Sequence, residues 1–541
     1  MNKSGVRPIL VLLAGLSVIV LLLFAPSLRS SFAFDSVEQI WVGDFIHQPR
    51  NLLPVLTFQV MGMDVLDFNR PVALASLMFD SLVWARNPFG YHLTNILLHM
   101  IATGLAFLLI RRVLDAGKTT KKPSKTDQLS RQNFSAFLGA LLFAVHPLVT
   151  EAVCEPSNRK DILATVFGLT ALLVAARHSP SKRQIDLLRI VVVALLTLLA
   201  IGSKELGVVV PVLIFLYWAL FRKKEPVKFW IATTLGSAFV VVIFLIARFS
   251  LAHQNSEVFL VPPVYPGGSL GAALLIQPRI LTLYLANVVW PTDLCADYNL
   301  YSIRNFPLPL SLFVLIVVGA GLAAWSIRDR RTFFAVGIVV AALLPVCNLV
   351  PIYCAAADRF LYFPLIGVAM LVSIALDHPF LVRQPLRYRI AAIAILIVAV
   401  FLTQVTLQRE RVWSSGLALW QSTLKTNPTS RFALTILPKC YLQIGHLQEA
   451  KAQYEASLNS PFGKDPWLWA GYAIVLNRLG DQQHAAMAAN RAVTLKPDII
   501  ETDKMVRTLQ HDREFDEEFA RLFASIRKTS SPNRHGATQE R

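Results

Sequence analysis

The chain has 541 residues, of which 55% are hydrophobic and 16% are charged, with a formal net charge of +18. This composition excludes an ordinary soluble globular domain and indicates an all-α, polytopic membrane protein with a soluble appendage. The positive charge does not indicate a nucleic-acid partner, because the Lys and Arg residues cluster in short loops between apolar segments, where they report membrane topology.

The first apolar segment, Ile9 to Phe24, is interpreted as a retained helix, because it continues to Leu28 without a small-x-small cleavage site and further spans follow. Eleven segments are long enough to cross, or nearly cross, a hydrocarbon core of about 30 Å. In chain order they are roughly Val6 to Leu28, Tyr91 to Ile110, Phe134 to Thr150, Ile162 to Ala176, Leu188 to Ile201, Leu206 to Phe221, Phe229 to Ala247, Leu308 to Ile327, Thr332 to Val350, Phe360 to Leu376 and Ile390 to Leu407.

Basic clusters in the loops set the orientation. Eleven spans place the basic loop from Arg111 to Arg131, which includes Lys121 and Asp127, in the cytoplasm together with the N-terminus. The opposite face receives a large first loop over residues 29–89 and a second loop over residues 249–307. The C-terminal region emerges on that opposite face as well.

Two further apolar segments are interpreted as interfacial or re-entrant helices. Ile276 to Trp290 contains Gln277, Pro278 and Arg279, and counting it as a span would move the basic cluster at residues 328–331 to the other side. Arg70 to Trp84 carries Asp80 and precedes a predicted turn.

From Trp413 onward the pattern changes to amphipathic helical pairs. Gly445, Ala450, Tyr454 and Leu458 recur as Gly480, Ala485, Ala489 and Val493, at an offset of 35 residues that is close to the tetratricopeptide period. We therefore expect a transmembrane domain over residues 1–408, tetratricopeptide repeats over 409–500, and a capping helix with a disordered tail over 501–541. A generic helical hairpin domain is the alternative.

Polar residues of the types that take part in catalysis and ligand binding lie at the ends of the apolar segments, on the extracytoplasmic face. Asp35 and Glu38 follow the first span, where a carboxylate beside apolar groups acts as a general base or is simply a solvated loop acid. His92 begins the second span and His146 ends the third. Helix–helix hydrogen bonding and a role in a watery cavity explain such histidines equally well.

Cations recur on the same face. Arg159, Lys204 and Arg359 stand in separate loops, each near an acidic residue. They either hold a phosphate or pair with those acids. Placing charges at the edge of a membrane costs free energy, and such charges are usually functional. This favours phosphate binding over simple pairing with the acids.

Several of these residues belong to longer motifs. The motifs are Phe-x-Phe-Asp ending at Asp35, Asn-Pro-Phe-Gly-Tyr-His-Leu-x-Asn-x-Leu-Leu-His from Asn87 to His99, His-Pro-x-x-x-Glu-Ala-Val from His146 to Val153 with Arg159-Lys160-Asp161, Ser-Lys-Glu from Ser203 to Glu205, and Asn-Leu-Val-Pro with Asp-Arg-Phe-Leu-Tyr-Phe-Pro between Asn348 and Pro364. In this order they resemble the transmembrane and tetratricopeptide-repeat-containing O-mannosyltransferase-like proteins of the GT-C glycosyltransferase superfamily. The resemblance runs from Phe32 to Pro497, and the short repeat array is more similar to bacterial members.

The resemblance implies transfer of a sugar, typically mannose, from a polyprenyl phosphate to a hydroxyl on the non-cytoplasmic face. By the same resemblance, the site residues are Asp35 as general base with Glu38 beside it, Arg159, Lys204 and Arg359 on the donor phosphate, and His92, His146 and Glu151 around the cavity. Ser36 stands where relatives usually carry a second acid, so either Glu38 compensates or activity is reduced or lost. No metal-ligand set is recognised, and a need for a divalent ion stays open.

The expected partners are the membrane, the lipid-linked sugar donor and an extracytoplasmic protein or peptide acceptor, bound in part by the repeats, with no nucleic acid. The expected location is the bacterial inner membrane with the repeats in the periplasm, or the endoplasmic reticulum membrane with the repeats in the lumen. The alternative from another class is a catalytically inactive membrane scaffold that binds a protein partner through its repeats. A transporter is disfavoured, because the sequence shows no inverted repeat.

Overall fold

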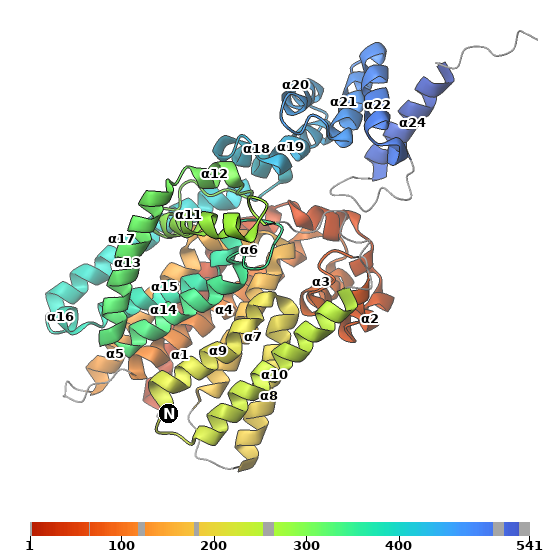
Figure 1. Cartoon of the computed structure of the whole chain (residues 1–541). Helices are drawn as coiled ribbons and strands as arrows, with labels where there is room; N and C mark the ends of the chain where they lie inside the picture. Colours follow the sequence, from red (N-terminus) through yellow and green to blue (C-terminus); the bar gives the residue numbers. More distant parts are fainter. Residues whose placement is uncertain are drawn as a thin grey trace, which may run out of the picture. The chain divides into compact units, whose positions relative to one another are not determined.

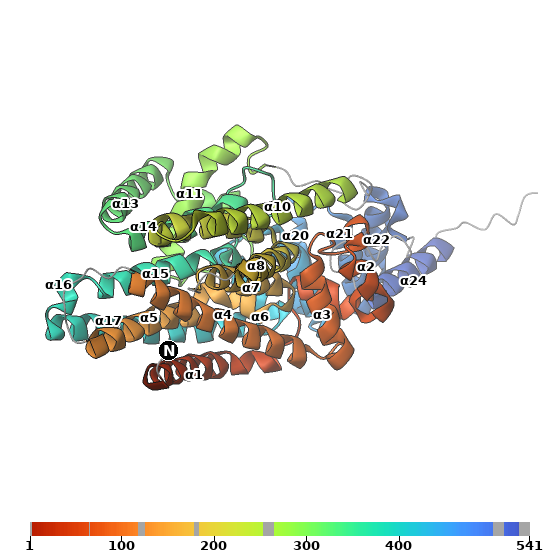
Figure 2. The ribbon, with the colours of Figure 1, turned by 90° about the horizontal axis from the view of Figure 1, so that it is seen from below.

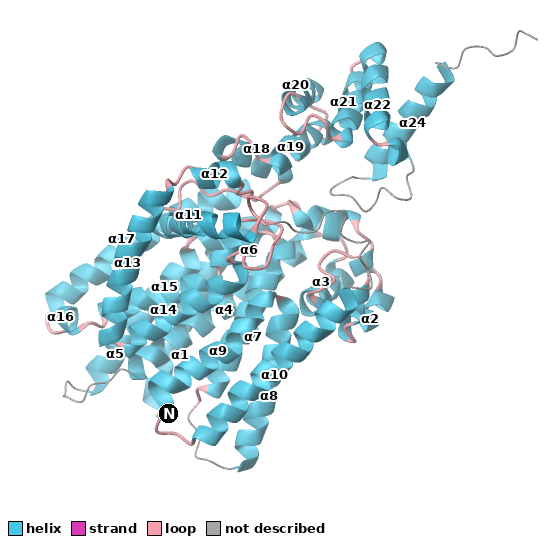
Figure 3. Ribbon diagram, viewed as in Figure 1, coloured by secondary structure: helices cyan, strands magenta, loops and turns pink. Residues whose placement is uncertain are grey.

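The computed structural model of the chain describes residues 3–63, 65–116, 125–177, 183–252, 265–500 and 513–529. Throughout these residues the protein is helical, and its β structure is limited to an isolated antiparallel bridge between Tyr298 and Ala356 (Figure 3). The predicted all-α class is confirmed for this part of the chain. The chain divides into two compact units, of which the first comprises Met1–Phe32 and Asp44–Ser414 and the second comprises Ala33–Gly43 and the chain from Ser415 onward.

The first unit is a bundle of long apolar helices (Figure 1). Its helices are α1 (Lys3–Phe24), α2 (Leu52–Leu56), α3 (Pro71–Trp84), α4 (Pro88–Ala116), α5 (Lys125–Val145), α6 (Thr150–Cys154), α7 (Arg159–Ala175), α8 (Arg183–Ser203), α9 (Val209–Tyr217), α10 (Val227–Ala252), α11 (Leu270–Val289), α12 (Leu300–Arg304), α13 (Leu308–Arg328), α14 (Arg330–Leu343), α15 (Pro364–Leu376), α16 (Pro379–Val382) and α17 (Pro385–Val412). Seen from below, α1 lies at one edge next to α4 and α5, and α13 lies at the opposite edge next to α14 (Figure 2).

Eight helical segments of the described chain are long and apolar enough to cross a membrane. They are Arg7–Arg29, Pro88–Ala116, Asp186–Ser203, Glu205–Arg222, Val227–Leu251, Leu270–Val289, Leu308–Arg328 and Pro385–Val412. A ninth arises if Ser130–Val145 and Pro147–Cys154, which are bent by 53° at His146, form one span. The protein is therefore an integral membrane protein.

Three of the eleven predicted spans correspond to helices that are shorter than a full crossing. Helices α7, α14 and α15 have 17, 14 and 13 residues, and a typical span needs about 20. The total of eleven stays a prediction.

The segment predicted to be interfacial, Ile276 to Trp290, is part of a longer helix than expected. Helix α11 begins at Leu270, where Ser269 caps it, and reaches 20 residues, which is long enough for a span. In Figure 1 it nevertheless runs across the direction of α13, its neighbour in the bundle. Its length is the feature that the sequence interpretation missed.

Small residues let the helices of this unit approach closely. A Cβ atom added at Gly139 of α5 would lie 2.0 Å from the Ser373 hydroxyl oxygen and 2.6 Å from the backbone oxygen of Ala369, both in α15. Only glycine fits this crossing, and small residues at helix contacts are typical of membrane bundles.

The second unit consists of paired helices. They are α18 (Gly416–Thr426), α19 (Arg431–Gln443), α20 (Leu447–Leu458), α21 (Pro466–Arg478), α22 (Gln482–Leu495) and α24 (Arg513–Thr529). The pairs α19/α20 and α21/α22 begin 35 residues apart, and the left-handed turns between their helices fall at Gly445 (φ 77°) and Gly480 (φ 85°). These hairpins agree with the predicted repeat, while their assignment as tetratricopeptide repeats stays a prediction.

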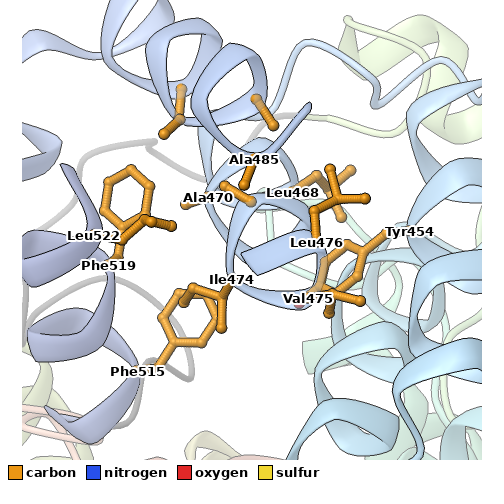
Figure 4. Close-up of a cluster of buried hydrophobic side chains, with 14 of the residues drawn as sticks. Tyr454, Leu468, Ala470, Ile474, Val475, Leu476, Ala485, Phe515, Phe519 and Leu522 are labelled. Atoms are coloured by element: carbon orange, nitrogen blue, oxygen red, sulfur yellow. The ribbon is translucent and has the colours of Figure 1, made fainter. Parts of the chain in front are cut away.

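One apolar cluster holds the last hairpin and the final helix together. Phe515, Phe519 and Leu522 of α24 join Ile474 of α21 and Ala485 of α22 in this cluster (Figure 4). Helix α24 thus packs on the last hairpin, while its role as a cap stays a prediction. Residues 501–512, and the predicted disordered tail beyond Thr529, lie outside the described chain.

Candidate active site

Two of the predicted phosphate-binding cations lie at the same aromatic ring. The ammonium of Lys204 is 5.1 Å from the centroid of the Phe360 ring, and the guanidinium carbon of Arg359 is 5.4 Å from it. The residues are 155 positions apart along the chain. The fold therefore brings the end of α8 and the short helix η12 (Asp358–Leu361) to one place.

Lys204 occupies a break between two helical segments. Its N–H donates to the Ala200 carbonyl at 3.1 Å and closes α8, after which the backbone is extended before η8 (Glu205–Val208). The ammonium donates to Asp161, which stands in the first turn of α7. A carboxylate is favoured there by the positive end of the helix dipole.

Arg359 is held by one carboxylate at two points. Its backbone N–H donates to Glu151 Oε2 at 2.9 Å, and its Nη1 donates to Glu151 Oε1. Its Nη2 lies 3.4 Å from the Cys354 sulfur. Glu151, predicted to line the cavity, thus positions Arg359, whose side chain keeps 13% of its surface exposed.

The neighbouring Asp358 has other partners. Tyr298 donates to Asp358 Oδ1 at 2.7 Å, and Arg409 of α17 lies 3.5 Å from Oδ2. Burial raises the pKa of Asp358 to about 7, with the charge of Glu151 adding to the rise and that of Arg409 opposing it. Arg359 therefore pairs directly with Glu151 and acts on Asp358 only through its nearby charge.

A second set of charges surrounds the end of the first loop, and sequence reasoning did not assign it to the site. Lys160 donates to both oxygens of Asp67, at 3.2 and 2.9 Å, and Arg70 bonds both Asp67 and Glu205. Arg248 of α10 adds a contact of 3.0 Å to Glu205. Burial alone would raise the pKa of Asp67, but the charges of Lys160 and Arg70 hold it well below its usual range.

The two sets meet at Lys204, because Arg359 and Arg70 both act electrostatically on its ammonium. Taken together, the named cations outnumber the named acids by one. The cations are Arg70, Lys160, Lys204, Arg248 and Arg359, and the acids are Asp67, Glu151, Asp161 and Glu205. An excess of partly buried positive charge suits an anionic ligand.

Arg159, the third predicted phosphate ligand, is fully committed to the protein. Its Nε donates to Asn95 at 2.7 Å, its Nη1 to the Ser76 carbonyl and hydroxyl at 3.1 Å each, and its Nη2 to Asp80 and to the Tyr91 carbonyl. These five bonds use all five guanidinium hydrogens. Arg159 joins α3, α4 and α7 and has no donor left for a phosphate.

The two predicted histidines are deeply buried. His92 is 0% exposed and lies beside the backbone of Ser30 and Ser31. His146 accepts a hydrogen bond from the Leu148 N–H at 3.2 Å, and its Nε2 lies 3.0 Å from the Val288 carbonyl of α11. His146 therefore stabilises the break after α5 and its contact with α11.

Asp35 and Glu38 belong to the second unit. Both are partly exposed, and Ser36 between them is fully buried. Phe34, directly before Asp35, has a positive φ of 51°, which is unusual for a residue other than glycine. Its ring packs on Trp420 and Phe432, with centroid distances of 5.6 and 6.3 Å, and these contacts hold the strained turn.

No group of three or more His, Cys, Asp or Glu side chains with metal-binding geometry occurs within the described ranges. The site is thus built from ion pairs and an aromatic ring.

No family model matches the sequence. The chain is 26% identical over 474 residues to protein O-mannosyl-transferase F38B6.6 of Caenorhabditis elegans, 24% identical over 476 residues to TMTC3 of Homo sapiens, and 26% identical over 453 residues to Tmtc3 of Drosophila melanogaster. These alignments cover 84%, 80% and 72% of this chain. The chain is similar to protein O-mannosyl-transferases over most of its length.

The resemblance to protein O-mannosyl-transferases predicted from the motifs is thereby confirmed, while the bacterial origin stays a prediction. The alignments cover 62%, 48% and 47% of these three protein O-mannosyl-transferases, so the chain spans less than two thirds of their length. A solved structure of ArnT from Cupriavidus metallidurans, bound to undecaprenyl phosphate, aligns over 96% of this chain and 88% of its own, with 12% identity and a TM-score of 0.41. A likeness at this level is too remote to transfer any feature of ArnT.

Proposed function

We propose that the chain is a membrane glycosyltransferase of the GT-C type that transfers mannose from a polyprenyl-phosphate donor to a hydroxyl of an extracytoplasmic protein or peptide. The observation that supports it best is the pair Lys204 and Arg359 on the Phe360 ring, each oriented by a carboxylate from another segment. The relatives' name gives the sugar, and the lipid phosphate fits the excess positive charge.

The proposed reaction is a single inverting displacement. The acceptor oxygen forms a bond to the anomeric carbon of the sugar while the bond from that carbon to the phosphate oxygen breaks. The polyprenyl phosphate leaves with the electron pair, and Lys204 and Arg359 stabilise its charge. Because a phosphate is already a good leaving group, the reaction needs one base and no strong acid.

Asp35 is the proposed base, which takes the proton of the acceptor hydroxyl, and Glu38 is the reserve candidate. Both proposals rest on the motif resemblance. The strained turn at Phe34 gives Asp35 additional support, because strained backbone is concentrated at functional sites. Arg159 is left out of the phosphate set because its donors are all used within the protein.

The deciding experiment is transfer of labelled mannose from a polyprenyl-phosphate donor by the purified full chain in proteoliposomes. Loss of a general base typically costs about 100- to 10,000-fold in rate, so Asp35→Asn should nearly abolish transfer. Asp293→Asn, which changes an exposed loop acid, serves as the matched control and should transfer at the wild-type rate. Wild-type turnover by Asp35→Asn would remove Asp35 from the mechanism and make Glu38 the next residue to test.

Ser36 favours one other candidate function, a catalytically inactive scaffold. It replaces the second acid of the motif and is fully buried, so its hydroxyl does not substitute for an exposed carboxylate. The same assay separates the two functions, because a scaffold shows no transfer with any lipid-linked sugar. Ser36→Asp then becomes informative, since it would restore transfer only if the rest of the site is intact.

A further inference from the structure

A cavity of about 580 Å³ lies at the opposite end of the bundle from Lys204. Its wall includes Leu173, near the C-terminal end of α7, whereas Asp161 of the candidate active site is in the first turn of the same helix. Twelve residues of helix separate them, which is roughly 18 Å along the axis. The cavity is therefore separate from the proposed transfer site.

Three of the nine residues that line the cavity are arginines. Arg111 and Arg112 come from the end of α4 and Arg222 from the end of the segment that contains α9, while Asp115 is the one acid of the lining. Among the described residues no carboxylate lies within ion-pair distance of Arg111 or Arg112. Arg222 pairs with Glu225 at 2.6 Å. The cavity thus carries more positive charge than its own residues neutralise.

Two of these guanidinium groups converge on one atom. Nη2 of Arg112 and Nη2 of Arg222 both donate to the backbone oxygen of Ala176, directly after α7. Like charges held this close repel each other, and an anion between them would relieve the repulsion. The third, Arg111, uses its Nε to bond Asn133 at 2.7 Å, and its Nη1 and Nη2 have no hydrogen bond to any described residue.

A tyrosine hydroxyl provides an independent sign of a missing ligand. Tyr217 lines the cavity and is 0% exposed, yet its hydroxyl has no hydrogen-bond partner in the described chain. The ring itself is fixed by Phe221, Trp230 and Phe334, with centroid distances of 5.2, 6.1 and 5.7 Å. Buried hydroxyl groups are nearly always bonded, and this one has no acceptor among the described residues, which leaves it available to a ligand.

We propose that this cavity binds the phosphate group of an anionic phospholipid. Guanidinium groups match phosphate oxygens in a planar, two-bond geometry, and the Tyr217 hydroxyl supplies a further donor. Leu108, Leu173 and Phe221 also line the cavity and offer an apolar surface for the start of the acyl chains. Basic pockets between transmembrane helices at a membrane surface are typical sites for anionic headgroups.

The test measures binding of dioctanoyl phosphatidylglycerol to the purified full chain in neutral detergent by native mass spectrometry. Dioctanoyl phosphatidylcholine and inorganic phosphate are the two comparison ligands. We expect phosphatidylglycerol to bind at least about tenfold more tightly than phosphatidylcholine, because the choline headgroup has no net charge for the arginines. Inorganic phosphate as tight as phosphatidylglycerol would overturn the lipid assignment.

Variants of the cavity complete the test. Arg111→Gln removes a charge that has one internal hydrogen bond, and we expect roughly a tenfold loss of phosphatidylglycerol binding. Tyr217→Phe keeps the packed ring, removes the hydroxyl and should give a smaller loss. Arg383→Gln, which changes an exposed arginine outside the cavity, is the matched control. Equal losses in Arg111→Gln and Arg383→Gln, or unchanged binding in both cavity variants, would overturn the proposal.

Discussion

At the scale of single residues, Arg359 and Glu151 form the most specific contact of the candidate site. Arg359→Lys keeps the charge but loses the planar guanidinium group, so use of the lipid-linked sugar should weaken. Arg359→Ala should lose about 100-fold in kcat/KM, as is typical when one hydrogen-bond donor to a developing anion is removed. Steady-state kinetics with a varied concentration of lipid-linked mannose gives both values.

The alternative role of Arg359 is to neutralise the buried carboxylate of Glu151. In that case Glu151→Gln and Arg359→Gln should each be unstable in detergent, and the double variant should recover stability and activity together. A double variant that is stable but inactive would support the phosphate role. Arg331→Gln is the matched control, because Arg331 is a buried arginine paired with Asp329 and Asp377 away from the site.

Asp358 links stability to pH. Its pKa is about 7 in the folded protein and near 3.8 in a free carboxyl, so the folded state holds a proton that the unfolded state has released between these values. Stability should therefore fall as the pH rises from about 4 to about 7. Thermal unfolding in detergent across this range should show the slope in the wild type, and Asp358→Asn should make it less steep. An unchanged slope in Asp358→Asn would assign the effect to another group.

At the scale of elements, the crossing of α5 and α15 depends on Gly139. Gly139→Ala places a methyl group against the Ser373 oxygen and the Ala369 backbone, so the helices must separate. The resulting overpacking typically costs about 1–3 kcal/mol. Gly319→Ala in α13 is the matched control, since an added Cβ there meets nothing within 4 Å.

Differential scanning fluorimetry of the two variants in one detergent provides the comparison. Gly139→Ala should melt at a lower temperature than the wild type and Gly319→Ala should not. Ser373→Ala should rescue Gly139→Ala only in part, because the Ala369 carbonyl remains in place. Equal melting temperatures for both glycine variants would contradict the close crossing.

At the scale of the whole molecule, the eleven-span prediction places the basic loops and the repeats on opposite sides of the membrane. Lys121 of the predicted cytoplasmic loop lies outside the described residues, so Lys223 serves as the probe for the basic loops and Gln482 as the probe for the repeats. Both side chains are exposed. Single cysteines placed there in a cysteine-free background should react with an impermeant thiol reagent from opposite sides. Labelling from the same side would contradict the eleven-span topology.

The sequence by itself determined the class of the protein, because apolar length and charge placement follow directly from the hydrophobic thickness of a membrane. It also located the 35-residue hairpins, since a helical period and a glycine turn are local properties, and the motif order was enough to predict the family. The same local reasoning placed the start of α11 too late, at Ile276 instead of Leu270. A polar stretch within a helix does not mark where that helix begins.

Only the tertiary structure decided which charges pair with which. Arg159, Lys204 and Arg359 are equivalent as sequence patterns, each a cation near an acid. In the folded chain Arg159 spends every donor on α3 and α4, whereas Lys204 and Arg359 converge on Phe360. Ion pairing depends on distance in space, and residues hundreds of positions apart become neighbours only when the helices that carry them pack together. For the same physical reason Glu151 became visible as the partner of Arg359 only in the folded molecule.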